Sequence, residues 1–508
     1  MELRAMKAAK YASVLAITAV LTGCAVGPDY HTPSTTLPSA YNSLLPSARP
    51  PVITDWWRSF EDPELNSLID RALAANFDLE IALARLQEAR TAEVVTEGGA
   101  LPELDASGAF ARGSGTNSTK GRVEGPLNAG TNTTGLKEIT QIVGFDAGWE
   151  LDLFGRYRRE IEAARDDTQA AAEARNAVLI TLFSDVARAY MDARSLQMRL
   201  KIAGDNIKIE HATVEVVQQR FDRGLTNELD LTLARRQLAT LQSEIGPLSA
   251  EMEAAERRLA VLLGEYPENL RVELQQSAQL PELPRDIETG LPLDLLRRRP
   301  DIREAERELA ANTALIGART ADLFPSVAIT AGAGLQGQGF GRRPEGNSFI
   351  WSAGPTAYWP LLDFGALDAQ IDIQDLRAHE ALVNYKRMIV SAVEEVENAL
   401  NSYSAEQDRL QNLSDALTAS QRAVTLANER YDRGLTDFLN VTDAERQLYE
   451  IQDQYAIARE DVIVQYIAIY KSLGGGWESY QKIPPVRRPQ PALVAAVREA
   501  ISPDNPQK

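Results

Sequence analysis

An internal duplication constrains this chain more than any other feature of its sequence. Residues 218–238 read QQRFDRGLTNELDLTLARRQL, and residues 428–448 read NERYDRGLTDFLNVTDAERQL, at an offset of 210 positions. The same offset relates Trp149–Gly155 (WELDLFG) to Trp359–Gly365 (WPLLDFG). The glycine inside each longer stretch interrupts a pattern that otherwise looks helical, so each copy carries a helix break at the same place.

The duplication extends upstream of these motifs at a slightly different offset. Phe77–Pro102 aligns with Pro300–Pro325 at an offset of 223 positions, and a Gly/Ser/Thr/Asn-rich insert at 112–135 lengthens the first copy. Units of roughly 200 residues are too long for a solenoid, whose repeats span about 20–50 residues. We therefore expect two domain-sized structural repeats, 62–263 and 286–474, with a linker at 264–285 between them.

Apolar residues recur every seven positions after each Phe-Gly pair. Eight consecutive steps are apolar in each copy, namely Ala172, Leu179, Val186, Ala193, Leu200, Ile207, Val214 and Phe221, and Leu382, Ile389, Val396, Tyr403, Leu410, Leu417, Val424 and Tyr431. A strict seven-residue spacing sustained over this length predicts a coiled coil. A helix over 366–431 would be roughly 100 Å long at about 1.5 Å per residue.

Each long helix is predicted to end at the duplicated glycine. A glycine readily adopts the left-handed conformation that terminates a helix. The apolar pattern then resumes over Asn227–Leu263 in the first copy and over Asp437–Leu473 in the second. Each repeat is therefore expected to form a long helical hairpin, with its tip at 222–227 or at 432–437.

Two segments before each long helix alternate loosely and are rich in Gly, Ala and aromatic residues. They are residues 102–112, 138–149, 325–338 and 348–359. Their length is that of tilted transmembrane β-strands, so we predict two strands in each repeat, at about 102–149 and about 325–360. Six aromatic residues fit an interfacial girdle: Phe145, Trp149, Phe349, Trp351, Tyr358 and Trp359. A pair of soluble hairpins is the alternative.

Four strands in one chain cannot close a barrel, and an open sheet edge is not tolerated in lipid. Three protomers would supply twelve strands, an even number large enough to enclose an aqueous lumen. Cyclic symmetry would bundle the helical hairpins of the three protomers below the strands. The expected fold class is a mixed α/β membrane protein: a trimeric tube with a shared 12-stranded β-barrel and a long α-helical coiled-coil barrel.

The N-terminus has the features of a lipoprotein export signal. Basic residues in MELRAMKAAK precede the apolar run YASVLAITAVL, which is too short to span a bilayer. The run ends in Leu-Thr-Gly before Cys24, the only cysteine of the chain. We predict a signal peptide at 1–23, covalent lipid on Cys24, an extended lipidated segment at 24–61 and a Pro-rich tail at 475–508. A plain signal peptide with an incidental cysteine is the alternative.

Composition and motifs argue against several other classes of protein. The net charge is −19, whereas nucleic-acid binders carry basic patches. Gly332–Gly337 matches G-x-G-x-x-G but is followed by residues that cannot open a helix, and Asp363–Gly365 spells a kinase signature without its partner motifs. The three histidines lack metal-ligand spacing. We expect no catalytic residues, no metal and no cofactor other than the lipid, and hence no enzyme.

These motifs together resemble the TolC family of outer-membrane efflux channels, in particular its OprM/NodT-type lipoprotein branch. The resemblance rests on CAVGPDY at 24–30, the strand segments, the Phe-Gly entries to the long helices and the duplicated Gly-Leu-Thr tips, and it covers nearly the whole mature chain. It implies a homotrimeric tube in the outer membrane of a Gram-negative bacterium that extends into the periplasm. It also implies passive export of drugs or other toxic compounds. The implied partners are a periplasmic adaptor, an inner-membrane RND-type pump and outer-membrane lipid.

The resemblance also implies roles for residues at the two tips. The residues that match the family's adaptor-docking turns are Arg223, Gly224, Leu225, Thr226, Arg433, Gly434, Leu435 and Thr436. Asp230 and Asp443 match carboxylates that ring the closed periplasmic end, and Tyr431 matches a tyrosine that holds the tips shut, with Asp230 as the candidate acceptor. A threefold axis would triple each carboxylate, so the ring would bind cations and repel anions. Thr436 and Asn440 depart from the family pattern, so a different latch is expected.

Two other functions fit parts of this pattern. A type I protein-secretion channel uses the same tube, although the lipoprotein start favours efflux. A lipid-anchored coiled-coil scaffold without a pore belongs to a different class. Conductance in a planar bilayer distinguishes a channel from such a scaffold.

Overall fold

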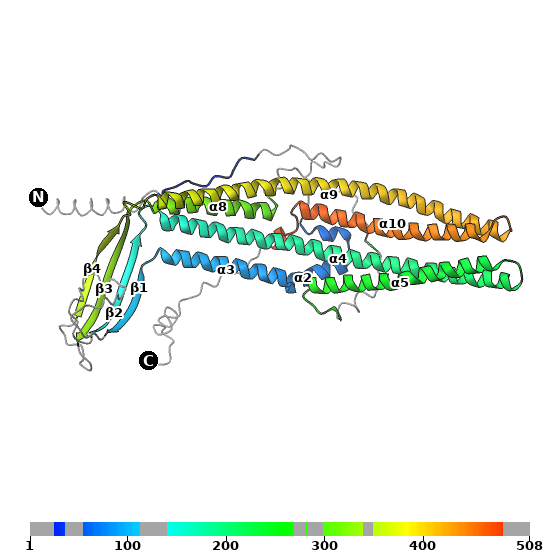
Figure 1. Ribbon diagram of the computed structural model, residues 1–508, viewed down its shortest axis with the longest axis horizontal. Helices are drawn as coiled ribbons and strands as arrows, with labels where there is room; N and C mark the ends of the chain where they lie inside the picture. The colour runs from blue at the N-terminus through cyan, green and yellow to red at the C-terminus, as the bar shows by residue number, and fades with distance from the viewer. Residues whose placement is uncertain are drawn as a thin grey trace.

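The computed structural model describes residues 25–35, 54–111, 140–268, 280–281, 298–338 and 349–480. The molecule is elongated, with a β-sheet at one end, two helical hairpin tips at the other end and long helices between them (Figure 1). The predicted signal peptide, Cys24, most of the linker and the tail beyond residue 480 lie outside the described residues.

Two helices of 67 residues each, α4 (Arg156–Asp222) and α9 (Ala366–Asp432), run along most of the molecule. Both start directly after the glycine of a Phe-Gly pair, which has a positive φ of 86° in one copy and 84° in the other. Each is followed by a return helix of 35 residues, α5 (Glu228–Leu262) or α10 (Phe438–Ser472). The seven-residue spacing and the duplicated glycine thus predicted both hairpins correctly.

The two hairpin tips have the same backbone geometry. Gly224 and Gly434 adopt φ values of 68° and 70°. The next residue in each copy donates its N–H back to the helix, Leu225 to the Arg220 carbonyl at 2.8 Å and Leu435 to the Arg430 carbonyl at 2.9 Å. This is the Schellman pattern of helix termination, which satisfies carbonyls that the helix leaves unpaired.

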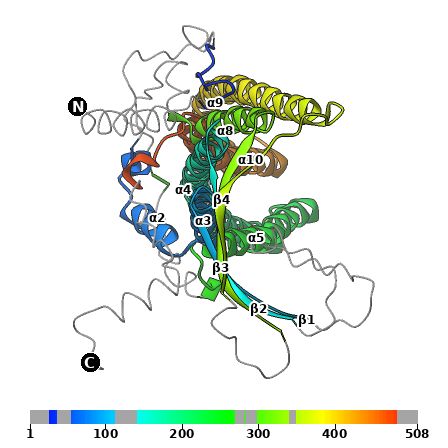
Figure 2. The same cartoon turned by 90° about the vertical axis from the view of Figure 1, so that its left-hand side faces the viewer.

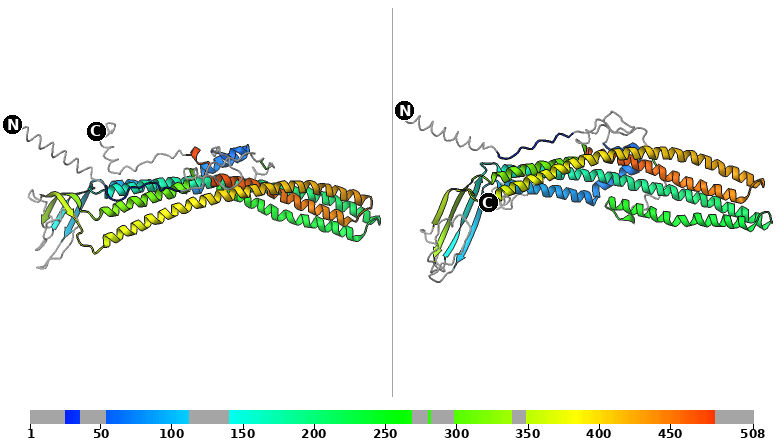
Figure 3. Two further views of the ribbon diagram at one scale, coloured as in Figure 1. Left: turned by 90° about the horizontal axis from the view of Figure 1, so that it is seen from above. Right: turned by 45° about the horizontal axis from the view of Figure 1, so that its top comes forward.

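A shorter helix extends each return helix towards the sheet. Helix α3 (Phe77–Gly99) and α5 follow one another along α4, while α8 (Pro300–Ala321) and α10 follow one another along α9 (Figures 1 and 3). The two repeats therefore have the same architecture. No helix among the described residues is long and apolar enough to cross a membrane.

The largest apolar core lies at the middle of the molecule, where short elements pack on the long helices. Helix α2 (Pro63–Ala75), η1 (Trp56–Phe60) and η4 (Glu478–Tyr480) supply these short elements. Trp57 is 1% exposed and packs against Phe183 of α4, with 4.5 Å between ring centroids. Seen end-on, the long helices form a curved layer and α2 lies on its convex side (Figure 2).

The sheet has four antiparallel strands in the order β1-β2-β3-β4. The strands are β1 (Glu103–Ala111), β2 (Thr140–Leu151), β3 (Ser326–Gln338) and β4 (Phe349–Tyr358). They occupy the four segments in which the sequence predicts strands. Within the described chain, β1 pairs only with β2 and β4 pairs only with β3, so the sheet has two open edges.

Candidate functional site

The two faces of the sheet differ sharply in polarity. Residues paired across antiparallel strands point to the same face, so the strand register assigns each side chain to a face. One face carries the large exposed apolar residues Leu104, Val143, Phe145, Trp149, Ile329, Leu335, Phe349 and Trp351. The other face carries mostly small or polar residues, with Ile350 and Tyr358 among its larger members, and there Ser107 donates a hydrogen bond to Asp146 at 2.8 Å. This alternation is typical of a strand with lipid on one side and water on the other.

The predicted interfacial aromatics do not all lie on the apolar face. Phe145, Phe349 and Trp351 do, and so does Trp149, whose indole N–H donates to the Ala100 carbonyl at 3.1 Å. Tyr358 pairs with a serine and therefore belongs to the polar face, because side chains alternate along a strand. Trp359 follows the end of β4 and donates to the Leu323 carbonyl at 3.0 Å, the position equivalent to Ala100 in the second repeat.

The N-terminal segment 25–35 is fixed where the sheet meets the helices. The backbone N–H of Val26 donates to the Phe154 carbonyl at 3.0 Å, directly before α4. The Arg159 side chain is 5% exposed and binds Asp29 at 2.7 Å. The residue after Cys24 therefore lies at the junction of β2 and α4.

The predicted docking tips are solvent-exposed. Arg223, Gly224, Leu225, Arg433, Gly434 and Leu435 are all exposed, and Thr226 and Thr436 are half-buried. Each tip presents two exposed leucines, one in the turn and one at the start of the return helix, which are Leu225 and Leu229 in the first repeat and Leu435 and Leu439 in the second. Both tips thus offer a small apolar surface beside an arginine.

The predicted gate tyrosine lies between the two hairpins. The guanidinium of Arg220 on α4 stacks 4.5 Å from the ring centroid of Tyr431 on α9, and Phe438 of α10 contacts the same ring at 5.3 Å. The Tyr431 hydroxyl is buried and has no hydrogen-bond partner in the described chain. The expected bond from Tyr431 to Asp230 is therefore not formed within this chain.

The two predicted gate carboxylates are held by residues of their own hairpins, close in sequence. Asp230 accepts a hydrogen bond from Thr226, at the start of α5. Asp443 forms an ion pair with Arg446 at 2.7 Å and accepts a hydrogen bond from Gln447 at 2.9 Å. The Asp443 side chain is 52% exposed, so its charge is both partly neutralised by Arg446 and accessible to water.

The two hairpins meet along a seam between α4 and α10. In this seam Arg199 binds Asp453 at 2.7 Å, and Asn206 donates to Gln452 at 2.8 Å. Closer to the tips, an apolar cluster joins all four hairpin helices. Its buried members are Val217, Leu231, Ala234, Phe438 and Val441. The seam is therefore polar in its middle and apolar near the tips.

A pair of acidic residues lies in this seam, and the sequence analysis did not identify it. Glu210 of α4 is 3% exposed, and one of its carboxyl oxygens has no hydrogen-bond partner. Burial and the nearby charge of Glu445 on α10 raise the pKa of Glu210 to about 7. Sequence spacing contained a signal, since Glu210 stands three residues after Ile207, at a heptad core position where a carboxylate is unexpected.

Each short helix is attached to its return helix by an equivalent hydrogen bond. Asn76 donates to the Leu262 carbonyl at the end of α5 at 2.9 Å, and Arg299 donates to the Ser472 carbonyl at the end of α10 at 3.0 Å. The duplication aligns Asn76 with Arg299 and Leu262 with Ser472. Both repeats therefore join their helices by the same contact, made by a neutral side chain in one copy and a charged one in the other.

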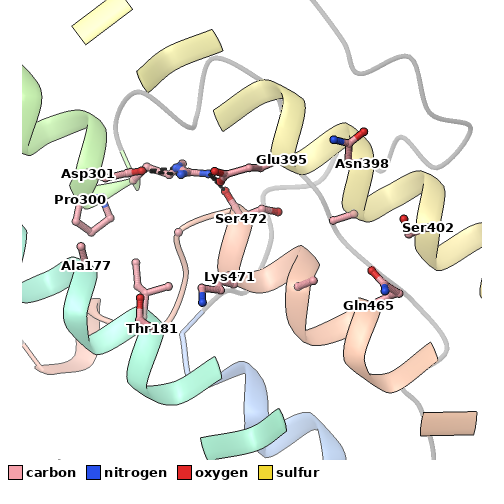
Figure 4. Close-up of a pocket in the computed structure, with 15 residues that line it drawn as sticks. Ala177, Thr181, Pro300, Asp301, Glu395, Asn398, Ser402, Gln465, Lys471 and Ser472 are labelled. Atoms are coloured by element: carbon pink, nitrogen blue, oxygen red, sulfur yellow. Dashed lines mark hydrogen bonds and ion pairs between the residues drawn. The ribbon is translucent and has the colours of Figure 1, made fainter. Parts of the chain in front are cut away.

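The Arg299 side chain that makes the second of these contacts borders a cavity of ≈ 590 Å³ between α4, α8, α9 and α10 (Figure 4). Arg299 also binds Asp301 and Glu395, each at 2.6 Å, so it connects α8, α9 and α10 at one point. In the described part of the chain, no three His, Cys, Asp or Glu residues gather in an arrangement that could hold a metal ion.

Comparison with known proteins shows similarity over most of the chain. A family described as "Outer membrane efflux protein" matches residues 68–265 and 291–475. Nodulation protein T of Rhizobium leguminosarum bv. trifolii is 30% identical, over 91% of this chain and 97% of that protein. The cation efflux system protein CusC of Escherichia coli (strain K12) is also 30% identical, over 91% of this chain and 98% of that protein.

A solved structure has the same fold. The outer-membrane channel OprN superposes with a TM-score of 0.80 at 36% sequence identity, and the match covers 89% of this chain and 100% of that chain. The sheet, the long helices and the tips described above all fall within the range of these similarities.

Proposed function

Because the chain belongs to the outer membrane efflux protein family, we propose that three copies of it form the exit duct of a tripartite efflux system. The protein is an outer-membrane efflux channel of TolC-like fold whose helices extend into the periplasm.

The main support is the sheet, which has one apolar face and two open edges. An open edge in lipid leaves backbone N–H and C=O groups unpaired at a cost of several kcal/mol each, so β1 of one copy must pair with β4 of the next. Three copies close twelve strands around a lumen lined by the polar face. Water then passes inside, and the row of large apolar residues faces lipid.

The duplication indicates how neighbouring copies meet. Within the chain, Phe154 of the first repeat stacks on Phe324 of the second, with 4.6 Å between ring centroids. The equivalent pair is Phe364 and Leu101, whose exposed fractions are 92% and 64% in the isolated chain. If a second copy packs against the first as the two repeats pack within the chain, Leu101 of the second copy contacts Phe364 of the first and both side chains are buried.

The long helices support the same contact between copies. In the repeat, α9 is equivalent to α4 and α3 is equivalent to α8. The half of α9 nearer the sheet should therefore meet α3 of the neighbouring copy in the way that α4 meets α8 within the chain. Both surfaces carry exposed apolar residues, which are Ile373, Leu376, Val383 and Val390 on α9 and Phe77, Ile81 and Val95 on α3. Continuous apolar surface of this kind on a soluble helix marks an interface.

The tips are the proposed docking surface for a periplasmic adaptor, which couples the duct to an inner-membrane RND-type pump. The exposed leucine pairs supply apolar contact, and Arg223 and Arg433 supply charge and direction. A partner with a helical hairpin end can pack an apolar side chain against the two leucines of a tip. Asp230, Asp443 and Tyr431 lie next to this surface, so docking there can act on the closed end.

The lipid on Cys24 is proposed to anchor each copy at the level where barrel and helices join. Residue 25 lies beside the β2–α4 junction, which places an adjacent acyl anchor near the membrane surface. Several acyl chains bind a membrane firmly, at about 0.8 kcal/mol per buried CH₂. The channel acts passively, and the pump supplies the energy for export.

The decisive experiment compares two neighbouring residues on opposite faces of β4. Ala353, near the middle of β4, lies on the apolar face and Ser352 on the polar face. Arginine on the apolar face near the membrane midplane costs roughly 2–4 kcal/mol per copy, so Ala353→Arg should abolish pore formation in planar bilayers. Ser352→Arg should leave pores that conduct with altered ion selectivity. Equal conductance of both variants, or none from the unmodified protein, contradicts the barrel.

A further inference from the structure

A bidentate ion pair joins the two hairpins of this chain in the middle of their seam. Arg199 of α4 donates two hydrogen bonds to the Asp453 carboxylate of α10, one of 2.7 Å and one of 3.1 Å. The two side chains are only 21% and 24% exposed. A bidentate, partly shielded pair of this kind holds two helices more firmly than an exposed ion pair does.

Two further hydrogen bonds connect the same hairpins. Asn206 of α4 donates to Gln452 of α10 at 2.8 Å. The hydroxyl of Tyr449 on α10 donates to the Glu244 carboxylate on α5. These two bonds and the ion pair together link α10 to both helices of the first hairpin, and we call the three contacts the hairpin clamp.

The duplication predicts which residues would occupy the same places between two copies. Helix α9 is equivalent to α4, and α10 is equivalent to α5, at a constant offset of 210 positions and with equal lengths. In the proposed trimer, α9 and α10 of one copy therefore meet α5 of the next copy in the way that α4 and α5 meet α10 within the chain. The trimer contains three seams of each kind.

The seam between copies has no equivalent of the hairpin clamp. The three equivalent pairs are Arg409 with Ser243, Ala416 with Gln242, and Gln454 with Ala239. None of these pairs joins opposite charges, and two of them contain alanine, whose side chain forms no hydrogen bond. The arginine is already bound within its own hairpin, to Glu406 and Asp461 at 3.0 Å each.

The apolar cluster near the tips is also specific to the seam within the chain. Its largest member, Phe438, is 1% exposed, and Val217 of α4 is buried to the same extent. The residues at the equivalent positions are Glu228, which is exposed, and Ala427. A carboxylate in place of a buried phenylalanine removes the main apolar contact, so the seam between copies is weaker near the tips as well.

We infer that the two hairpins of each copy move as one rigid unit and that the channel opens along the three seams between copies. This inference rests on the proposed function, since it identifies which interfaces of the proposed trimer separate. Separating the hairpins of one copy would break an ion pair, two hydrogen bonds and an apolar cluster. Separating two copies breaks no equivalent contact and therefore costs less free energy.

The test crosslinks the two kinds of seam at equivalent positions of the full-length protein. The first double variant is Asn206→Cys, Gln452→Cys, within a copy, and the second is Ala416→Cys, Gln242→Cys, between copies. Each is treated with a short, reducible bifunctional methanethiosulfonate and recorded in planar bilayers. Crosslinking of the first pair should leave the open probability unchanged. Crosslinking of the second pair should abolish opening, and reduction should restore it.

Denaturing gels and thiol titration show whether each link has formed, as monomers for the first pair and covalent trimers for the second. Loss of opening on crosslinking the first pair overturns the inference, and so does normal opening of the covalent trimers. Failure of either pair to crosslink also overturns it, because the packing on which it depends is then absent. No conductance from the unmodified protein would instead contradict the proposed channel.

A clamp contact placed in the seam between copies tests the same inference without a crosslink. Ser243→Asp puts a carboxylate opposite Arg409 of the neighbouring copy, at the place equivalent to Asp453. It should lower the open probability by up to roughly fivefold for each seam. The same substitution in an Arg409→Gln background should have no such effect. An equal effect in both backgrounds, or none in either, contradicts the inferred seam.

Discussion

At the scale of single residues, Tyr431 connects the two hairpins through its ring and not through its hydroxyl. The ring contacts Arg220 of one hairpin and Phe438 of the other, whereas the hydroxyl is buried within the chain without a partner. A cation–π contact contributes about 0.5–2 kcal/mol, and an aromatic pair contributes about 0.5–1.5 kcal/mol. Within the described chain, the contact of this residue that joins the two hairpins is therefore the stacking of Arg220 on the Tyr431 ring.

This assignment predicts different behaviour for two substitutions of the same residue. Tyr431→Phe should leave leak conductance unchanged, because it removes only an unpaired hydroxyl. Tyr431→Ala should raise the leak, because it removes contacts worth on the order of 2 kcal/mol. Single-channel recording without adaptor measures both. A Tyr431→Phe channel as leaky as Tyr431→Ala would show that the hydroxyl closes the tip after all.

At the scale of helices, two glycines with the same left-handed backbone conformation differ in the space they leave for a side chain. Gly224 ends α4 and Gly264 follows the end of α5, with φ values of 68° and 67°. A methyl group on Gly224 would meet nothing within 4 Å, whereas on Gly264 it would lie 2.1 Å from the Ala75 carbonyl oxygen. Gly264 is thus required by the close contact between the ends of α5 and α2, whereas Gly224 is required only by its backbone angle.

Alanine substitutions should separate these two causes. Gly224→Ala should destabilise the protein by about 1–2 kcal/mol, the cost of a left-handed conformation. Gly264→Ala adds a steric clash, so its total cost should be about 3 kcal/mol or more. Denaturant midpoints of the detergent-solubilised protein measure the difference. Equal shifts for the two variants would mean that the chain at Gly264 relaxes without cost.

At the scale of the whole molecule, the contact of the first repeat with the second that the Phe154–Phe324 pair makes is formed only once within the chain. Phe154 finds Phe324 within the chain, whereas Phe364 and Leu101 remain exposed. A closed ring of copies makes the second set of contacts as well as the first. We therefore expect Phe364 and Leu101, which stay exposed in one protomer, to contact neighbouring protomers.

Cysteine pairs can test this ring directly. Leu101→Cys, Phe364→Cys should give covalent trimers after treatment with a short bifunctional maleimide, because the two positions meet only between copies. The internal pair Phe154→Cys, Phe324→Cys is the control and should give monomers. Denaturing gels read the outcome. Monomers alone from the first pair would disprove the proposed contact between protomers.

Much of the fold was predictable because its signals are local. The seven-residue spacing and the duplicated glycines predicted the long helices, and strand length with aromatic content predicted β1 to β4. The exposure of the tips followed from the same turns. The face of Tyr358 follows from its spacing of seven residues from Trp351, since side chains alternate along a strand. The bonding of Asp230 was not predictable in this way, because it depends on a neighbouring side chain.

The sequence by itself determined where this chain turns, which segments are helices or strands, and that the pattern is written twice. Those properties depend on residues a few positions apart, whose spacing is visible in the sequence. Only the tertiary structure decided which residues of the two copies meet, as Arg199 meets Asp453 and Phe154 meets Phe324. Such pairs depend on how the two long hairpins pack side by side. In a duplicated chain each residue has two equivalent positions as possible partners, so the sequence alone does not select between them.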